Sequence, residues 1–321
     1  ENVVFGQEIE KDLDRRDFTI NAMAIEISEK LVGNGEPVGR LLDFHQGEAD
    51  LESGILRAVG DAENRLGEDG LRVLRAFRFL ESGEDGLRKL DPMLSNSISS
   101  NLEMIGKVSK ERIWAELSRI LNGPHSKEII EIMHEHGVLG KIIPDVHVNL
   151  EVIHSQDCMV NLALICSSER SNGLDLSTKL AADLRLSRNE ASIISLLHDL
   201  RGLELDNSIK SVRRFIATIS NSNRFRVIDY LSGTGVDTES FEACYQSVGD
   251  LRAGNTPLID GNLLSSLTGI GPGRKLGRLK DWLHRIQVEE DIENRESLVA
   301  ILGEIEWEES EFEDWPVLIW P

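Results

Sequence analysis

Apolar residues recur at helical spacing along most of this chain, from about residue 61 onward. Two stretches show the pattern most clearly, "EDGLRVLRAFRFL" at 68–80 and "SKERIWAELSRIL" at 109–121, the second with Ser109 as its predicted N-cap. Strand-like alternation is rare. Because aromatic residues make up only 5% of the 321 residues, leucine, isoleucine and valine must fill the core. We therefore expect a mostly α fold.

Residues 1–60 have a different, mixed α/β pattern. "MAIEIS" at 23–28 and "VGRLLD" at 38–43 alternate like two short strands, and Asn34-Gly35 between them is a turn signal. A β-hairpin is expected there. Asp17 is expected to cap a short helix that runs through Ala22.

The net charge of −21 argues at first against a nucleic-acid partner. Its distribution changes that interpretation, because residues 289–321 contain twelve acidic residues and one basic residue, about half of the total charge. The rest of the chain is mildly acidic and contains local clusters of basic residues. Within the acidic segment, Trp307, Trp315 and Trp320 are expected to dock it, either onto the body of the protein or onto a partner.

Three arginines follow one another at every third position in segment 68–79: Arg72, Arg75 and Arg78. In a single helix they span about 120° of one face, opposite the apolar residues, and Asp69 neighbours Arg72 at i, i+3. One interpretation is a solvated helix with a salt bridge. The other is an anion, a triphosphate or an RNA backbone, that lies along the guanidinium groups.

Asp69 and Arg72 have a second possible meaning. A carboxylate only accepts hydrogen bonds and a guanidinium only donates them, so the pair matches the amino group and ring nitrogen of cytosine or adenine. Uracil and guanine present the reverse order. A mispaired buried polar group costs about 1–3 kcal/mol, so one such pair could select C and A.

Four segments in this order resemble the signature motifs of class II tRNA nucleotidyltransferases, the CCA-adding enzymes, and of their bacterial poly(A) polymerase relatives. They are "DLDRRDFTINAMA", "DFHQGEADLESGILRAVG", "EDGLRVLRAFRF" and "SKERIWAEL". The resemblance covers residues 9–121 at motif level. It is weaker over 123–303, where "LIDGNLLSSLTGIGPGRKLGRLKDWL" is similar to the tail segment of the family.

The resemblance implies an elongated head, neck, body and tail arrangement. The expected parts are a remnant of the nucleotidyltransferase head at 1–60, a helical neck that binds nucleotide and RNA at 61–125, a helical body at 126–230, a tRNA-binding tail at 231–303 and an acidic extension at 304–321. The implied function is template-independent addition of C and A to tRNA 3′ ends, with CTP, ATP and tRNA as partners and Mg²⁺ as cofactor.

The same resemblance assigns roles to individual residues. Arg16 contacts the incoming nucleotide, Asp69 and Arg72 form the protein template for its base, and Arg75 and Arg78 complete the pocket. Supporting residues are Arg15, Asp17 and Asn21, and residues expected to join head to neck are Asp43, Gly47 and Arg57.

The chain departs from the family pattern at the metal site. Family chemistry needs an Asp-x-Asp pair on a head strand after a glycine-rich turn. Asp12-Leu13-Asp14 is an Asp-x-Asp sequence, but no glycine-rich turn precedes it and it lies inside the arginine motif. We therefore expect no metal site and no catalytic residue in this chain. We expect the Mg²⁺ ligands in a preceding segment or a separate head subunit, and we expect this chain alone to be inactive.

A basic stretch near the C-terminus, "GIGPGRKLGRLKDWLHR", supplies a second candidate site. Residues predicted to contact the tRNA backbone are Arg274, Lys275, Arg278 and Lys280. The alternative is an ordinary turn followed by a basic amphipathic helix. His198-Asp199 resembles the His-Asp motif of metal-dependent phosphohydrolases. The further His and Asp ligands that such a site needs are not found in matching helices, so His198 is expected to be a capped or core histidine.

Other functions stay open at this point. They are a bacterial-type poly(A) polymerase, a split A-adding or CC-adding enzyme, and a non-catalytic tRNA-binding module. The three cysteines have no metal-binding spacing and indicate reduced thiols in a cytoplasmic protein. No apolar run reaches about 18 residues, so no membrane partner is expected.

Overall fold

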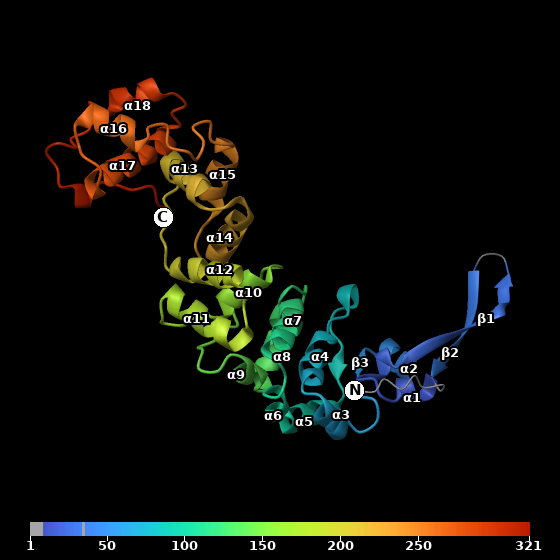
Figure 1. Ribbon diagram of the computed structural model, residues 1–321. Helices are drawn as coiled ribbons and strands as arrows, with labels where there is room; N and C mark the ends of the chain where they lie inside the picture. The colour runs from blue at the N-terminus through green and yellow to red at the C-terminus, as the bar shows by residue number, and fades with distance from the viewer. Residues whose placement is uncertain (1–8, 34–35) are drawn as a thin grey trace. The chain divides into compact units, whose positions relative to one another are not determined.

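The computed structural model describes residues 9–33 and 36–321 (Figure 1). The chain divides into two compact units, residues 1–199 and 200–321. Helices dominate both, which confirms the expected mostly α fold; the five-part division stays a prediction. In the described residues, no helix combines the length and the apolar character that crossing a membrane requires.

The first unit begins with a short helix and a β-hairpin. Its elements are α1 (Ile9–Leu13), a 3₁₀ turn η1 (Thr19–Asn21), β1 (Met23–Gly33) and β2 (Glu36–Asp43). The strands pair antiparallel, with Met23 opposite Asp43, which confirms the predicted hairpin. Asn34 and Gly35, the predicted turn, lie outside the described residues.

The prediction for Asp17 was wrong in detail. Phe18 occupies the N-cap position of η1, and the helix ends before Ala22. One oxygen of Asp17 accepts from the Phe18 N–H and the Asn21 side-chain amide, while the other accepts from Arg75. The ion pair with Arg75 therefore fixes this carboxylate beside the 3₁₀ turn rather than at its start.

Three predicted linking residues connect the hairpin to the helices that follow. The elements are α2 (Gly47–Glu52), β3 (Ile55–Leu56) and β4 (Lys89–Leu90), the last two paired in parallel. Asp43 accepts from the first N–H groups of α2, and Gly47 lies so close to Thr19 that a Cβ atom would be 2.2 Å from its carbonyl oxygen. Arg57 bridges Asp50 and Asp91.

Segment 68–80 is not one continuous helix, contrary to expectation. Helix α3 (Ala62–Glu68) stops at Asp69, which has an extended backbone, and α4 (Leu71–Arg78) starts after Gly70. At this junction Gly70 lies close to another helix, since a Cβ on Gly70 would be 2.1 Å from the carbonyl oxygen of Met104. Asp69 therefore does not precede Arg72 on a common helix.

Eight helices complete the first unit. They are α5 (Pro92–Ser100), α6 (Leu102–Ile105), α7 (Lys110–Leu121), α8 (Ser126–Glu135), α9 (Val138–Ile142), α10 (Cys158–Ile165), α11 (Gly173–Leu184) and α12 (Arg188–Asp199). Helix α4 packs against α7, and α11 packs against α12. Ser109 is the N-cap of α7, as predicted. His198 is fully buried and contacts the carbonyl of Ser171.

The second unit is helical, and its C-terminal segment packs back onto it. It contains α13 (Ile209–Thr218), α14 (Asn221–Gly233), α15 (Glu239–Val248), α16 (Gly261–Thr268), α17 (Arg274–Glu290), α18 (Arg295–Leu302) and a 3₁₀ turn η3 (Phe312–Asp314). Trp315 is buried beside Trp282, and Trp320 packs against Phe215 and Phe241. The tryptophans therefore dock the acidic segment onto its own unit.

Candidate functional site

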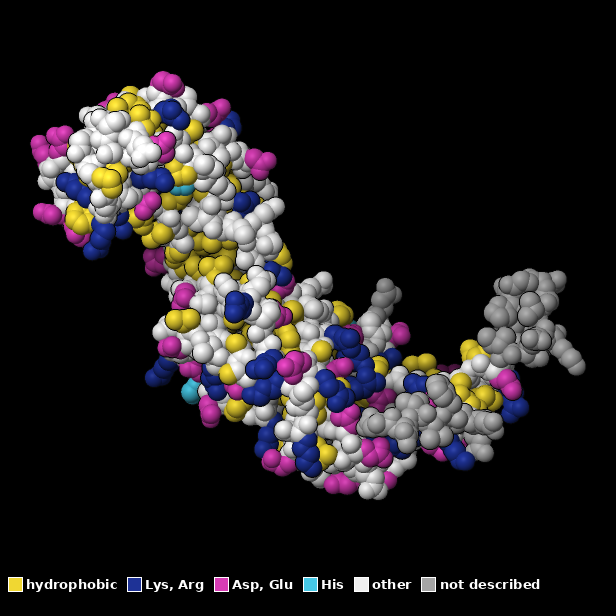
Figure 2. Space-filling model, viewed as in Figure 1, with side chains coloured by type: hydrophobic (Ala, Val, Ile, Leu, Met, Phe, Trp, Pro, Cys, Tyr) yellow, Lys and Arg dark blue, Asp and Glu magenta, His cyan; other side chains and the backbone are white. Residues whose placement is uncertain are grey.

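An open pocket of about 560 Å³ in the first unit collects most of the residues singled out by the sequence. Its lining residues are Arg15, Arg16, Asp17, Asn21, Asp69, Leu71, Arg72, Arg75, Phe79 and Arg112. They come from the segment after α1, η1, the α3–α4 junction, α4 and α7. Lys and Arg side chains gather over the part of the unit that contains α4 and α7 (Figure 2). We call this the arginine pocket.

Arg15 and Arg16 share one carboxylate at the edge of the arginine pocket. Their Nη2 atoms lie 2.8 and 3.0 Å from the oxygens of Asp12, and both guanidinium groups remain more than half exposed. Hydrogen bonds from Arg16 and then Arg15 hold the pKa of the Asp12 carboxyl below its usual value. Asp14 is paired with His45 at 3.0 Å. Both acids of the Asp-x-Asp sequence are thus engaged by basic side chains.

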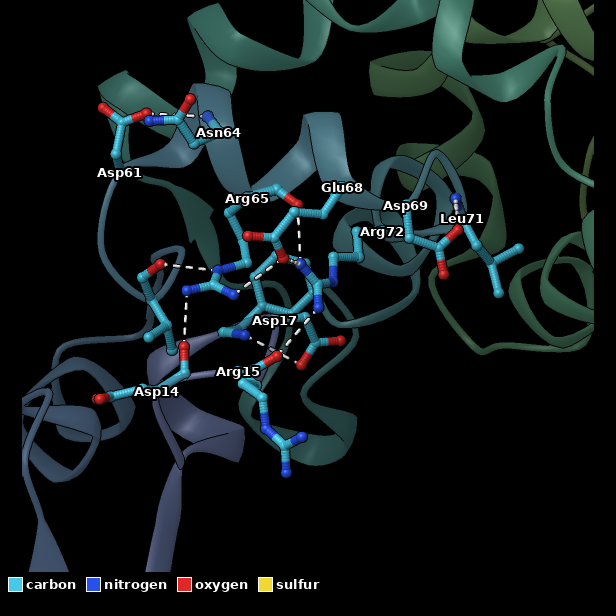
Figure 3. Close-up of polar contacts among 12 residues, drawn as sticks. Asp14, Arg15, Asp17, Asp61, Asn64, Arg65, Glu68, Asp69, Leu71 and Arg72 are labelled. Atoms are coloured by element: carbon cyan, nitrogen blue, oxygen red, sulfur yellow. Dashed lines mark hydrogen bonds and ion pairs between the residues drawn. The ribbon is translucent and has the colours of Figure 1, made fainter. Parts of the chain in front are cut away.

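Arg72 is held from three directions (Figure 3). It forms an ion pair with Glu68 and donates to the backbone carbonyls of Arg65, at 2.9 Å, and Arg15, at 3.0 Å. Burial raises the pKa of the Glu68 carboxyl, but the hydrogen bond from Arg72 and the charges of Arg65 and Arg72 lower it below the usual value. The guanidinium of Arg72 is thereby fixed at the wall of the pocket.

The i, i+3 spacing suggested a salt bridge between Asp69 and Arg72. In the structure the Asp69 carboxylate has other partners. One oxygen accepts from the Leu71 N–H at 3.0 Å, and the other accepts from Arg112 Nη2 at 2.9 Å. Burial raises the pKa of the Asp69 carboxyl, but these two donors and nearby positive charge lower it overall. Asp69 and Arg72 still line the same pocket, each oriented by other partners.

The row of three arginines is divided between two environments. Arg75 lines the pocket and pairs with the buried Asp17 at 2.6 Å. Arg78 does not line it; its Nε lies 2.9 Å from the buried Glu116 of α7. Burial lowers the pKa of the Arg78 guanidinium, although the charge of Glu116 opposes this. The acid partner of Arg78 lies on the neighbouring helix, and a role for Arg78 in completing the nucleotide pocket stays a prediction.

Two further lining residues had been left without a role. Arg112 lies in "SKERIWAEL", three residues after the N-cap Ser109. Phe79 follows the third arginine and ends α4. Both were inside quoted motifs, so the signal was present, but their contacts depend on the packing of α7 against α4.

The charge of the arginine pocket favours an anionic ligand. Five arginines line it, against the two carboxylates of Asp17 and Asp69. Guanidinium groups bind phosphate through paired N–H donors, and the half-exposed Asp69 adds an acceptor for a donor group elsewhere on the same ligand. An elongated ligand with phosphate at one end and a polar ring at the other fits this lining.

The predicted basic face of α17 is not uniformly free. Arg274 is exposed, but Arg278 donates to the carbonyls of Trp315 at 2.8 Å and Glu313 at 3.2 Å. The ammonium of Lys275 lies 5.7 Å from the centre of the Trp315 ring. Lys280, at 100° per residue, points about 160° away from Arg278. Only part of the predicted tRNA-contact set therefore shares an open surface.

The described residues do not fit a metal centre. Within 9–33 and 36–321, no group of three or more His, Cys, Asp or Glu side chains is placed to hold a metal ion. A two-metal site needs several such carboxylate ligands together. Asp12 and Asp14 lie two residues apart and already lie against Arg15, Arg16 and His45, so they do not supply the set.

Two family models match the chain. The poly(A) polymerase head domain matches residues 1–57, and the probable RNA- and SrmB-binding site of polymerase A matches residues 89–150. The arginine pocket lies among residues from the first match, from the stretch between the two and, through Arg112, from the second.

Two curated relatives are a CCA-adding enzyme and a CCA tRNA nucleotidyltransferase. A CCA-adding enzyme of Lactobacillus johnsonii is 37% identical over 142 residues, 44% of this chain and 32% of the relative. The mitochondrial CCA tRNA nucleotidyltransferase 1 of Mus musculus is 32% identical over 197 residues, 60% of this chain and 43% of the relative. The chain therefore spans less than half the length of these relatives.

The structural comparison concerns the fold. The crystal structure of the Bacillus stearothermophilus CCA-adding enzyme in complex with CTP matches 94% of this chain and 75% of that chain, with a TM-score of 0.74 and 22% identity. That likeness agrees with the mostly α architecture. None of these comparisons supports a separate subunit that carries a head domain.

Proposed function

We propose, since this chain belongs to the class II CCA-adding enzyme family, that its arginine pocket selects CTP and ATP for template-independent addition of C and A to tRNA 3′ ends. One observation carries the proposal: Arg16, Asp69, Arg72 and Arg75 line one pocket, although they come from three separate segments of the chain. The solved relative named above is a complex with CTP, and the mouse relative is named for tRNA.

The pocket offers a division of labour between phosphate and base. Arg15, Arg16 and Arg75 supply positive charge for the triphosphate. Asp69 supplies an acceptor, and Arg72 keeps one Nη2–H and its Nε–H beyond the three hydrogen bonds it makes to its own chain. That acceptor and donor match the pairing edges of cytosine and adenine and mismatch those of uracil and guanine.

Phosphoryl transfer by this family uses Mg²⁺, and the described residues do not fit its site. No step through the metal is assigned to this chain. We expect the 321-residue polypeptide, given tRNA that lacks its 3′ end, CTP, ATP and Mg²⁺, to add no nucleotides. Robust template-free extension would contradict this and return Asp12 and Asp14 to consideration.

A poly(A) polymerase is the second candidate, favoured by the descriptions of the two family models. The two functions differ in nucleotide selection, because polyadenylation needs ATP alone. A chain that binds CTP and ATP comparably supports C and A addition, whereas a clear preference for ATP supports the polymerase. Selection of one nucleotide alone also describes a split A-adding or CC-adding enzyme.

Calorimetric titration of the chain with CTP, ATP, UTP and GTP tests the proposal. We expect CTP and ATP to bind more tightly than UTP and GTP, and Arg75→Ala to weaken all four. Arg170→Ala, which removes an exposed arginine outside the pocket, is the matched control. Equal affinity for all four nucleotides, or affinity for tRNA without any nucleotide, would favour a non-catalytic tRNA-binding module.

The proposed cellular location is cytoplasmic, because the three cysteines have no metal-binding spacing and indicate reduced thiols. The mouse relative is mitochondrial by name. Fractionation of cells that express the protein, with detection in the cytosolic and organellar fractions, tests the location.

A further inference from the structure

Phe79 has an unusual set of neighbours for a residue that lines a polar pocket. The guanidinium carbon of Arg78 lies 4.3 Å from the centre of its ring, and that of Arg75 lies 5.1 Å from it. Phe18, which is fully buried, packs edge-on against the same ring at 5.7 Å between centroids. One aromatic side chain therefore contacts two cations and the core.

The two guanidinium groups are held at their N–H edges by different acids. Asp17 accepts from Arg75 at 2.6 Å, and Glu116 lies 2.9 Å from Arg78. Both carboxylates are at least nine-tenths buried, so they are fixed by the protein core. Each arginine thus has a buried acid at its N–H groups and a guanidinium carbon over the ring of Phe79.

This arrangement limits how Arg75 can move. An ion pair alone leaves a guanidinium free to swing about its partner, whereas an aromatic ring adds a second, electrostatic constraint on the cation. The like charge of Arg78 nearby repels Arg75, and the ring attracts both. Arg75 lines the pocket and Arg78 does not, so only Arg75 is presented to a ligand.

We propose that Phe79 is a positioning residue that holds the Arg75 guanidinium at the pocket wall, where it meets the phosphate groups of the nucleotide. The inference rests on the proposed nucleotide site and adds a residue to it. Phe79 acts through Arg75 and not on the base, so it sets affinity for the phosphate groups and leaves base preference unchanged. The competing role is stacking of the base on Phe79. In that role Phe79 would affect the affinity for the base and leave the affinity for the phosphate groups unchanged.

Titration of the chain with CTP, ATP and inorganic tripolyphosphate separates these roles. We expect Phe79→Leu, which keeps an apolar side chain and removes the ring, to weaken all three ligands by a common factor of roughly 2- to 30-fold. Phe79→Tyr keeps the ring and should restore affinity. Phe44→Leu removes a half-exposed ring outside the pocket and is the matched control.

A double-mutant cycle shows whether Phe79 acts through Arg75. In an Arg75→Gln background, Phe79→Leu should cause no further loss of tripolyphosphate affinity, a result that a general structural role would not produce. If Phe79→Leu fails to fold, as judged by its melting temperature, Phe79→Met takes its place in the same cycle.

Three outcomes would overturn the inference. Unchanged affinity of Phe79→Leu removes any positioning role, and loss of CTP and ATP affinity with tripolyphosphate affinity intact assigns Phe79 to base stacking. Independent losses in the cycle make Phe79 a structural residue. A wild-type chain that binds none of the three ligands overturns the nucleotide site itself, and that result is distinct from the other three.

Discussion

Arg112 donates to Asp69 at 2.9 Å between Nη2 and Oδ2, across 43 positions of sequence. Asp69 follows the end of α3, and Arg112 lies in the first turn of α7. Because the second oxygen of Asp69 accepts from the Leu71 N–H, two donors fix the direction of the carboxylate. The acid expected to choose the base is therefore oriented by a helix that sequence proximity does not suggest.

Base selection should depend on Asp69 and Arg72 in different ways. Asp69→Ala removes the acceptor for an amino group and leaves Arg72 to donate to carbonyl oxygens. The affinity for UTP and GTP should therefore rise relative to the affinity for CTP and ATP. Arg72→Ala should weaken CTP and ATP together by about tenfold to a hundredfold, the value of a hydrogen bond to a charged group. Competition binding with four triphosphates measures both changes.

Arg75→Ala serves as the comparison, since it should lower affinity for all four triphosphates without changing their order. If Asp69→Ala bound nucleotides weakly yet kept its full preference for C and A, the template role would fail. Asp69 would then be a structural acid that joins α3 to α7.

The titration of Asp69 should respond to Arg112. Its pKa in the folded state lies below the usual value, so the ionised carboxylate stabilises the fold above the unfolded-state pKa, and this contribution is lost as pH falls through the folded-state pKa. Arg112→Ala removes a hydrogen bond and a positive charge. The Asp69 pKa should rise toward its unfolded-state value, so the carboxylate should contribute less stability near neutral pH, and the loss of that contribution should be complete at a higher pH.

Carboxyl carbon NMR over roughly pH 2 to 6 follows this titration, and urea unfolding at the same pH values follows the stability. Arg112→Lys, which keeps the charge, should give an intermediate pKa. An Asp69 pKa that is the same in the wild type and in Arg112→Ala would show that the Leu71 N–H and other charges suffice to lower it.

The sequence predicted the elements that depend on local patterns. Apolar spacing marked the helices, and alternation around Asn34-Gly35 marked the hairpin. The break at Asp69-Gly70 was not predictable in this way, and it lies where Gly70 meets the backbone of Met104 on another helix. A continuous helical pattern carries no sign of such a contact.

The site shows the same division between local and tertiary information. Residue types and motif order singled out Arg16, Asp69, Arg72 and Arg75, and these four side chains line one pocket. The partners of Asp69 and Arg78 were missed, because Arg112 and Glu116 come from α7 and reach α4 and its N-terminal flank only through packing. A spacing of i, i+3 suggested the Asp69–Arg72 pair, and the helix break removed it.

Cys166 should be unreactive in the folded protein. It is fully buried at the end of α10, and burial, with a smaller effect from the charge of Glu169, raises the pKa of its thiol to about 12. The thiolate is the reactive form, so Cys166 should resist a thiol reagent near pH 8. Cys158 and Cys244 are half-buried and should react first.

Ellman's reagent with and without denaturant measures this difference. Cys166→Ala should leave the reactive thiol count of the native chain unchanged and lower the count in denaturant by one. Rapid native modification of Cys166, detected by peptide mass, would show that α10 opens readily.

The cations of α17 should contribute unequally to RNA binding. Each phosphate contact adds roughly one unit to the slope of log affinity against log salt. Arg274 is exposed, so Arg274→Ala should lower the slope for tRNA by about one unit, whereas Arg278 is occupied by the carbonyls of Trp315 and Glu313. Arg278→Ala should leave the slope unchanged and instead lower the stability of the second unit, because the C-terminal segment loses two hydrogen bonds.

Filter binding across salt concentrations measures the slope, and urea unfolding followed by tryptophan fluorescence measures the stability. An equal slope change in both variants would mean that Arg278 leaves those carbonyls to meet RNA.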